Sequence, residues 1–409
     1  MVRVISVEHH RAKVTALLDR PVTQDRPLAD CAGLVLAADV PAGVALPPFD
    51  NSAMDGYAVR SVDVVEAGER HPVQLPVAAD IPAGRTDVPA LLPGTAHRIM
   101  TGAPLPSGAD AVVPVERTDG GTEKVRISAP ADPGAHVRRT GEDIGPGAVA
   151  LAAGTVLGPA QLGLAAAIGR DRLPVRVPPR VLVVSTGTEL VLPPEPLRHG
   201  QIYESNSVML VAALRGLGCR VDVVRCVADD VPAFRAAVEP RLAGVDLVVT
   251  SGGVSAGAYE VVKDALTGAG VEFAKVGMQP GGPQGRGRWH GVPVVALPGN
   301  PVAVLVSFEV FLRPALRTAL GHPDPDRARV PARLTEDLTS PAGKRQFRRG
   351  HYTPPRPGDA DARVGLVGPR GGPGSHLLAA FTQANCLIVL PEDTTEAPAG
   401  TVVDVLLLG

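Results

Sequence analysis

The chain has 409 residues, enough for about three domains, and its 45% hydrophobic content is ample for several cores. Its formal net charge is −2, and its basic residues are scattered rather than clustered in a stripe, which argues against nucleic acid as a partner. No run approaches the ~18 apolar residues of a membrane helix, and the first residues lack the apolar core of a signal peptide. We therefore expect a cytoplasmic protein that binds neither nucleic acid nor membrane.

The cysteines support the same expectation. Cys31, Cys219, Cys226 and Cys386 show no C-x-x-C spacing and lie in apolar surroundings. Such residues are typical of small buried hydrophobes in a reducing compartment, so we assign them no thiol chemistry.

The first part of the chain alternates between helical and extended patterns. Val7 to Leu18 carries apolar residues at mixed helical spacing, and Gly33 to Val40 contains a short extended piece. From Phe49 to about Arg139, short β-like runs alternate with Gly/Pro turns, which predicts a mainly β module. Gly154 to Ile168 returns to a helical pattern.

A proline-rich linker at Pro174 to Pro179 introduces a different pattern, in which strands and helices alternate to about Gly321. The predicted strands are 180–185, 219–226, 245–250, 271–276 and 292–297, and the predicted helices are 206–217, 231–242, 258–268 and 301–320. This alternation is typical of a doubly wound sheet. After a second linker at Pro323 to Pro325, residues 328–409 show β runs and no long helical stretch.

One loop in the predicted sheet is rich in glycine. The segment Thr250–Gly257 reads TSGGVSAG; it follows the apolar run Val245–Val249 and precedes a helical pattern. Glycine lets the backbone approach a ligand closely, and the N–H groups that open the next helix favour an anion. A tight turn without a ligand is the alternative.

Two further strand ends carry similar loops. The strand 292–297 runs into Pro298-Gly299-Asn300-Pro301, where Pro301 suits a first helical position and Asn300 can cap the helix. The run Val181–Val184 leads into Ser185–Leu190. Ligands of open parallel sheets bind outside the carboxyl ends of strands, so we expect the three loops to converge on one site.

Five sequence blocks together carry a family resemblance. The loops read TSGGVSAGAYE, LPGNPVA and TGTEL, and the N-terminal part contains PFDNSAMDGYA at Pro48–Ala58 and MTGAPLPSGADAVV at Met100–Val113. In this order they resemble the molybdopterin-binding proteins MoeA and the gephyrin E domain, and the resemblance spans most of the chain.

The resemblance implies an α/β multi-domain fold: a doubly wound molybdopterin-binding sheet domain, an inserted mainly β module and a C-terminal small β-barrel. The implied domains are a mainly helical N-terminal domain (1–42 plus 140–176), the inserted module (43–139), the sheet domain (177–326) and the barrel (327–409).

Carboxylates lie in or beside the loops. Glu189 belongs to TGTEL, Asp229 and Asp230 follow a predicted strand, and Glu260 follows the glycine loop. Carboxylates beside phosphate-binding loops suit Mg²⁺-assisted cleavage of a phosphoanhydride, because the cation offsets repulsion between phosphates and acids. For each acid a helix cap or a solvated surface group is the alternative.

The resemblance also implies an activity. MoeA-like proteins take adenylylated molybdopterin and molybdate, release AMP and leave molybdenum on the dithiolene sulfurs. They work as homodimers in which the SAMDGY-containing module of one subunit completes the cleft of the other. A molybdopterin adenylyltransferase and a molybdoenzyme are the protein partners that such a reaction implies.

The family's site residues carry over by matching motif positions. The implied catalytic residues are Asp55, Thr101, Asp143, Glu189, Glu260, Arg349 and Ser375. The implied ligand-binding residues are Thr186, Gly187, Asp229, Ser251, Gly252, Gly253, Ser255, Pro298, Gly299 and Asn300. Asp55, Glu189 and Glu260 are the implied Mg²⁺ ligands.

The chain departs from the family pattern at one segment. Where the family often has KPGKP, this chain reads QPGGP, so Gln279 and Gly282 replace two lysines near the expected phosphate and molybdate region. Lys275, Arg286 and Arg288 are nearby but out of register, and Ala258 replaces a common acid. A non-catalytic scaffold paralogue is therefore an alternative, as is a nucleotide-cleaving enzyme that shares only the sheet domain. The latter does not account for SAMDGYA.

Overall fold

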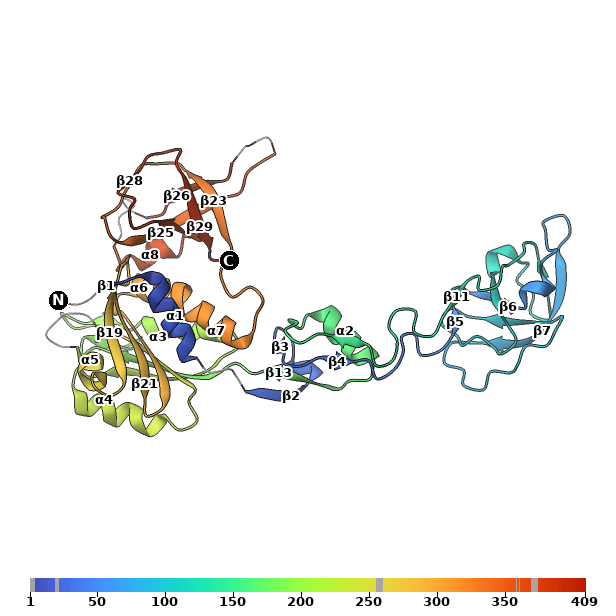
Figure 1. The fold of residues 1–409 in the computed structure, drawn as a ribbon, viewed down its shortest axis with the longest axis horizontal. Helices are drawn as coiled ribbons and strands as arrows, with labels where there is room; N and C mark the ends of the chain where they lie inside the picture. Colours follow the sequence, from blue (N-terminus) through green and yellow to red (C-terminus); the bar gives the residue numbers. More distant parts are fainter. Residues whose placement is uncertain (1–3, 19–21, 255–259, 358, 360, 369–373) are drawn as a thin grey trace. The chain divides into compact units, whose positions relative to one another are not determined.

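A computed structural model describes residues 4–18, 22–254, 260–357, 359, 361–368 and 374–409. The chain forms two compact units (Figure 1). The sheet-and-barrel unit comprises Met1–Thr23 and Arg176–Gly409, and the inserted unit comprises Gln24–Val175. Every helix in the described ranges is too short or too polar to cross a lipid bilayer.

A seven-stranded sheet organises the first unit. Its order is β1-β19-β21-β22-β18-β14-β17. The strands are β1 (Val4–Ile5), β14 (Arg180–Thr186), β17 (Arg220–Val227), β18 (Leu247–Ser251), β19 (Val271–Val276), β21 (Pro283–Trp289) and β22 (Val292–Leu297). The neighbours β17, β14, β18 and β22 are parallel, whereas β21 is antiparallel to both of its neighbours.

Helices cover both faces of this sheet. One face packs against α1 (Val7–Leu17), α3 (Asn206–Arg215), and a continuous helix of α6 (Pro301–Ser307), the π-helical turn η5 (Phe308–Leu312) and α7 (Arg313–Leu320). The other packs against α4 (Val231–Val238) and α5 (Val261–Leu266). Successive strand side chains point to opposite faces, so β14 buries Val183 on the α1 side and Val184 on the α4 side. The predicted doubly wound sheet is confirmed.

Most predicted elements of the sheet domain form where expected. Strands 271–276 and 292–297 have the predicted bounds, and the helix 301–320 is continuous. The prediction missed β21, because its sequence PQGRGRW carries glycine, glutamine and arginine instead of an apolar strand pattern. Its two glycine positions need glycine: a Cβ on Gly285 would lie 2.6 Å from the Phe273 ring, and one on Gly287 would lie 2.1 Å from the Gly270 carbonyl oxygen.

The C-terminal part of the same unit is a closed five-stranded barrel. Its strands pair in the order β25 (Arg345–Thr353), β26 (Arg363–Leu366), β23 (Arg329–Leu334), β29 (Val402–Leu407) and β27 (Cys386–Leu390), and β27 pairs back to β25. The strand β20 (Met278–Gln279) leaves the sheet domain and pairs with β25. The expected small β-barrel is confirmed.

The inserted unit contains the expected mainly β module. Its five strands follow the order β10 (Lys124–Ile127), β7 (Val73–Ile81), β8 (Ala96–Ile99), β6 (Gly56–Val59) and β9 (Ala111–Pro114). This module carries both N-terminal sequence blocks.

The remaining part of the inserted unit differs from the prediction. We expected a mainly helical domain from residues 1–42 and 140–176. Its described residues in the inserted unit form one α-helix, α2 (Pro159–Ala167), with the short strands β3 (Val35–Leu36), β4 (Val40–Pro41) and β12 (Val149–Leu151), and with most of β2 (Thr23–Pro27) and β13 (Arg172–Arg176). The helix α1 packs on the sheet of the other unit, because its buried face supplies Val7, His10 and Val14 there. The four domain boundaries stay a prediction.

Three cysteine side chains have the expected environment. Cys31, Cys219 and Cys386 are buried and free, and burial raises the pKa of the Cys219 and Cys386 thiols to about 12. The side chain of Cys226 is not among those that the structure describes.

A buried histidine anchors α1. His10 is fully buried, its ring lies edge-on to Phe311 at 4.6 Å, and Arg286 Nη1 lies 3.0 Å from its Nδ1. Burial, with the charges of Arg286 and His9, lowers the pKa of His10 to about 3. The imidazole is therefore neutral at pH 7, and its Nδ1 accepts the hydrogen bond from Arg286.

This histidine predicts an acid-sensitive stability. The unfolded chain binds a proton at His10 below about pH 6.5, whereas the folded chain does not until about pH 3. Lowering the pH from 6.5 to 5 should therefore remove about 2 kcal/mol of the unfolding free energy, at about 1.4 kcal/mol per pH unit. Urea unfolding followed by Trp289, the single tryptophan, measures it. His10→Gln should lose this pH dependence and the exposed control His199→Gln should keep it; a His10→Gln variant with the wild-type slope would contradict the assignment.

Candidate active site

Three loops meet at one edge of the sheet. The strands β14, β18 and β22 are adjacent and parallel, and Ser185, Ser251 and Leu297 lie in register at their carboxyl ends. The last strand residues and the loops after them are 186–189, 250–254 and 298–300, which we call the cradle. The three strand ends are therefore adjacent, as predicted, and their use as one ligand site stays a prediction.

Glycine backbone permits close contact within the cradle. Gly252 has φ +93°, and its N–H donates to the Leu297 carbonyl at 3.2 Å. A Cβ at Gly252 would lie 2.8 Å from the Thr186 carbonyl oxygen, and one at Gly299 would lie 3.4 Å from the Gly252 Cα. The three loops therefore touch, and the Thr186 side chain lies beside the Gly252 backbone.

Several buried polar atoms of the cradle have no partner. Among the described residues, the Oγ atoms of Thr186, Thr250 and Ser251 are buried and make no hydrogen bond. A buried hydroxyl without a partner costs about 1–3 kcal/mol, so such groups gather where a ligand supplies the missing bond. Ser255 and Ala258 lie outside the described residues.

Two residues that the sequence interpretation missed lie at the start of α3, and one of them contacts the cradle. Asn206 donates from Nδ2 to the Gly299 carbonyl at 2.7 Å, and its Oδ1 is buried without a described partner. Glu204 is buried and accepts hydrogen bonds from the N–H, at 2.7 Å, and the hydroxyl of Ser207. The only signal in the sequence is the run Glu204-Ser205-Asn206-Ser207, which is equally typical of a helix start.

The acidic residues near the cradle have different contacts. Asp229 Oδ2 accepts from the N–H and the hydroxyl of Thr188, at 3.0 and 3.1 Å, so it holds the TGTEL loop. The cap of α4 is Asp230, which accepts from Ala233 N at 2.8 Å. Glu189 is exposed on the TGTEL loop, and its carboxylate is adjacent to Gly187.

Glu260 is buried at the start of α5. It is the N-cap residue of this helix, although its side chain makes no capping hydrogen bond there. The resemblance predicts that Glu260 is a metal ligand. The structure places its buried carboxylate on the segment that follows the glycine loop.

The barrel reaches the cradle through Ser375. Asn300 is the N-cap residue of α6, but its Nδ2 donates to Ser375 Oγ at 2.8 Å instead of its side chain capping the helix as expected. Val302 N donates to the Ser375 carbonyl at 3.1 Å, and Arg349 Nη1 donates to the Gly374 carbonyl at 2.8 Å. Hydrogen bonds thus connect Arg349 to the 374–375 segment, and Ser375 to the start of α6.

The other predicted catalytic residues belong to the inserted unit. Asp55 Oδ1 accepts from the N–H and the hydroxyl of Thr101, both at 2.7 Å, and these bonds hold the pKa of the Asp55 carboxyl below its usual range. Asp143 is exposed, and its N–H donates to the Leu46 carbonyl at 2.9 Å. The structure therefore joins Asp55 to Thr101 within the inserted unit.

The predicted metal set spans the two units, with Glu189 and Glu260 in one and Asp55 in the other. The described part of the chain holds no group of three or more His, Cys, Asp or Glu side chains that could bind a metal ion. Their joint coordination stays a prediction.

Comparison with known proteins identifies the family. Residues 5–169 match the MoeA N-terminal region (domain I and II), residues 182–318 match a probable molybdopterin binding domain, and residues 331–408 match the MoeA C-terminal region (domain IV). The chain belongs to the MoeA family.

Individual relatives agree over the full length. Molybdopterin molybdenumtransferase 2 of Mycobacterium tuberculosis is 54% identical and aligns over 97% of this chain and 98% of its own. Molybdopterin molybdenumtransferase 1 of the same organism is 41% identical over 98% of this chain and 99% of its own. The crystal structure of the molybdopterin biosynthesis MoeA protein of Pyrococcus horikoshii has a TM-score of 0.84, 32% identity and 99% coverage of both chains.

The segment that departs from the usual MoeA pattern lies beside the barrel. Gln346 Nε2 donates to Gln279 Oε1 at 3.1 Å, so Gln279 joins β20 to β25. Arg286 binds His10, and Arg288 Nη2 donates to the Leu17 carbonyl at 2.9 Å. Both arginines are engaged at α1.

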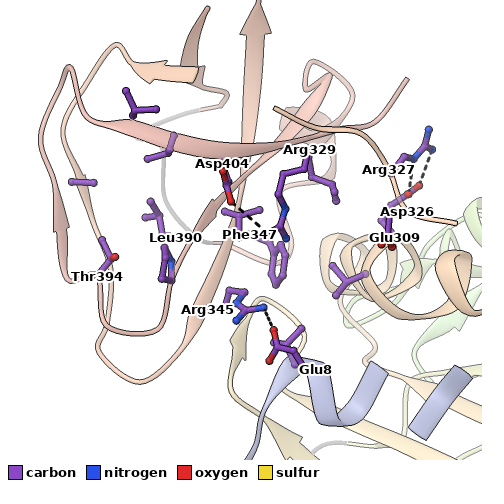
Figure 2. Close-up of a pocket in the computed structure, with 18 of the residues that line it drawn as sticks. Glu8, Glu309, Asp326, Arg327, Arg329, Arg345, Phe347, Leu390, Thr394 and Asp404 are labelled. Carbon is purple, nitrogen blue, oxygen red and sulfur yellow. Dashed lines mark hydrogen bonds and ion pairs between the residues drawn. The ribbon is translucent and has the colours of Figure 1, made fainter. Parts of the chain in front are cut away.

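A separate cavity of about 830 Å³ lies where α1 and η5 meet the barrel (Figure 2). Arg345 pairs with Glu8 and Glu392, and Arg327 donates two hydrogen bonds to Glu309, at 2.9 and 3.2 Å. Carboxylates thus neutralise these arginines, and no predicted site residue lines the cavity. We assign it no part in the reaction.

Gly252 provides a test of the cradle's close packing. Gly252→Ala and Gly268→Ala both place alanine at a positive φ, +93° and +77°, but only Gly252 has neighbours within 4 Å of the added Cβ. Both should lose about 1–2 kcal/mol of unfolding free energy from strain, and Gly252→Ala should lose a further 1–3 kcal/mol or so from the contact with Thr186. Urea unfolding of the two variants measures the difference. Equal losses would mean that the loops separate freely.

Proposed function

We propose that this protein inserts molybdate into adenylylated molybdopterin, releases AMP and leaves molybdenum on the dithiolene sulfurs. The observation that carries the proposal is the cradle, with buried hydroxyls that lack described partners at the ends of three parallel strands. Membership of the MoeA family and relatives named molybdopterin molybdenumtransferase support the substrate. No observation favours a scaffold role.

The cradle binds the phosphate-containing part of the substrate in this proposal. The hydroxyls of Thr186 and Ser251 donate to anionic oxygens. The remaining predicted ligand-binding residues Gly187, Gly253, Pro298 and Gly299 supply backbone at the same edge, and Asp229 fixes the TGTEL loop through Thr188.

Mg²⁺ fits the donor chemistry of the acidic residues. Carboxylate oxygens are the ligands that Mg²⁺ prefers, and the buried Glu260 and the exposed Glu189 flank the cradle loops in the sequence. We propose that these two residues hold the cation, with Asp55 from an inserted unit. When bound, Mg²⁺ supplies positive charge against the phosphates.

Arg349 and Ser375 are proposed to receive molybdate. Arg349 holds the Gly374 carbonyl, and Ser375 binds Asn300 at the helix start, so positive charge and a hydroxyl group are adjacent to the cradle. A guanidinium and a hydroxyl are suitable donors for a tetrahedral oxyanion.

We also propose a cytoplasmic homodimer with a shared cleft. Asp55, Thr101 and Asp143 lie in the inserted unit, whereas Glu189 and Glu260 lie in the sheet-and-barrel unit. The inserted unit of one subunit completes the cleft of its partner in this proposal. A molybdopterin adenylyltransferase that supplies the substrate and a molybdoenzyme that takes the product are the proposed protein partners.

The deciding experiment measures AMP release from adenylylated molybdopterin by the purified protein with Mg²⁺, with and without molybdate. Molybdate-dependent release supports the transferase and makes Gln279 and Gly282 tolerated substitutions. Tight binding without release would contradict the proposal and favour a scaffold.

Glu189 is expected to be required for turnover. Glu189→Gln keeps the shape of the side chain and removes its charge, so AMP release should slow by about 10²-fold, the scale of losing one electrostatic contact to a transition state. Glu195→Gln is the matched control, because Glu195 is also exposed in the segment that follows the TGTEL loop. Equal rates for the two variants would remove Glu189 from the mechanism.

Complementation tests the shared cleft. Asp55→Asn and Glu189→Gln should each be nearly inactive as homodimers. After unfolding and refolding of an equal mixture, about half of the dimers should be mixed, each with one intact cleft, so activity should return to about a quarter of wild type. No recovery, with mixed dimers verified by two affinity tags, would mean that each cleft is built from one chain.

A further inference from the structure

Asp50 connects two segments of the inserted unit by its side chain. Its Oδ1 accepts from the N–H and the hydroxyl of Thr140, at 2.7 and 2.9 Å. Its Oδ2 accepts from Arg139 Nη1 at 2.7 Å. One carboxylate therefore receives three hydrogen bonds from two consecutive residues that are 89 and 90 positions away in the sequence.

Each of the two segments carries a proposed catalytic carboxylate. Asp55 lies five residues after Asp50, and Asp143 lies three residues after Thr140. The backbones are also paired: β5 (Asn51–Ser52) is antiparallel to β11 (Val137–Arg138). The Asp50 bonds extend this short ladder up to the turn that leads to Asp143.

A third segment, which carries Thr101, joins the same place. Gly102 N donates to the Ser52 carbonyl at 2.8 Å, and Ser52 N donates to the Ala103 carbonyl at 3.0 Å. Thr101 itself binds Asp55. The strand that follows Asp50 therefore lies between the two other segments that bear proposed site residues.

Asp50 holds the start of the 139–143 turn, and backbone bonds hold its end. Gly141 N donates to the Pro47 carbonyl at 3.0 Å and Asp143 N to the Leu46 carbonyl at 2.9 Å, whereas the described side-chain bonds to Arg139 and Thr140 come from Asp50 and from Glu142, which accepts from Arg139 N at 3.0 Å. The hydrogen bond from Thr140 N and then the one from Arg139 hold the pKa of the Asp50 carboxyl below its usual range, so it is ionised at neutral pH. Hydrogen bonds to an ionised carboxylate are stronger than those between neutral groups.

We propose that Asp50 is a positioning residue that fixes Asp143 relative to Asp55 and Thr101. The inference rests on the proposed function for its kinetic consequence, whereas its structural consequence can be measured without any reaction. Asp50 touches neither substrate nor metal in this proposal, and it acts through the 139–143 turn.

Hydrogen exchange tests the structural part on the full-length protein. Asp50→Ala should raise the exchange rate of the Thr140 amide by about tenfold or more, because this N–H loses its acceptor. The amides of Gly141 and Asp143 keep their backbone acceptors, so a smaller rise there reports the loosening of the turn. Asp119→Ala is the matched control: Asp119 accepts from the amides of Gly121 and Arg126 in the same unit and touches neither segment. Unchanged exchange at 140–143 would overturn the proposal.

Kinetics test the functional part. In Asp50→Ala, kcat for AMP release should fall by about tenfold or more while KM changes little, since misplacement of a reacting group by ~1 Å can cost 10²-fold. Asp50→Glu should recover part of the loss and Asp119→Ala should show none. In an Asp143→Asn background, Asp50→Ala should cost almost nothing more, because a residue that acts through Asp143 cannot add to its loss. Full additivity would overturn the positioning role.

Two further measurements separate the possible failures. If Asp50→Ala does not fold, as judged by circular dichroism, Arg139→Gln removes a single donor and should give smaller changes of the same kind; none would overturn the proposal. If wild type releases no AMP, the proposed function fails while the exchange experiment still decides whether Asp50 orders the turn.

Discussion

The structure depends on the register of three parallel strands. Because β14, β18 and β22 end together, the loops after them begin at one edge of the sheet. Parallel pairing needs a crossover between each pair of strands, and the helices of these crossovers bury both sheet faces. The apolar residues of these three strands therefore stabilise the unit by their burial. The strands end in polar residues and loops, and this sets the place of the proposed site.

The barrel is tied to this edge by a few specific contacts. The strand β20 pairs with β25 on one side, and Ser375 binds the start of α6 on the other. Arg349 lies on β25 and holds the turn that carries Ser375. Two hydrogen bonds therefore connect β25 to the start of α6: Arg349 to the Gly374 carbonyl, and Asn300 to Ser375. Barrel residues that are far from the cradle in sequence thus lie next to it.

The sequence predicted the sheet domain well, because its signals are local. Pro301 at a first helical position and an uninterrupted apolar pattern indicated a helix to residue 320, and it forms. The position of α1 could not be predicted in this way, because the same helical spacing fits any apolar surface. The packing of α1 on this sheet depends on long-range contacts such as that of His10 with Arg286. Asn206 was missed for a related reason, since its bond to Gly299 spans 93 residues and its local pattern is that of a helix start.

The acidic residues of the inserted unit are held by local hydrogen bonds. Asp55 is held ionised by Thr101, and Asp50 by Thr140 and Arg139, so the inserted unit presents fixed negative charge. A phosphate-bearing ligand in the cradle would be repelled by such charge unless a cation lay between them. In the proposed mechanism the cation therefore lowers the cost of bringing these carboxylates close to the phosphates, while the cradle hydroxyls bind the anionic oxygens.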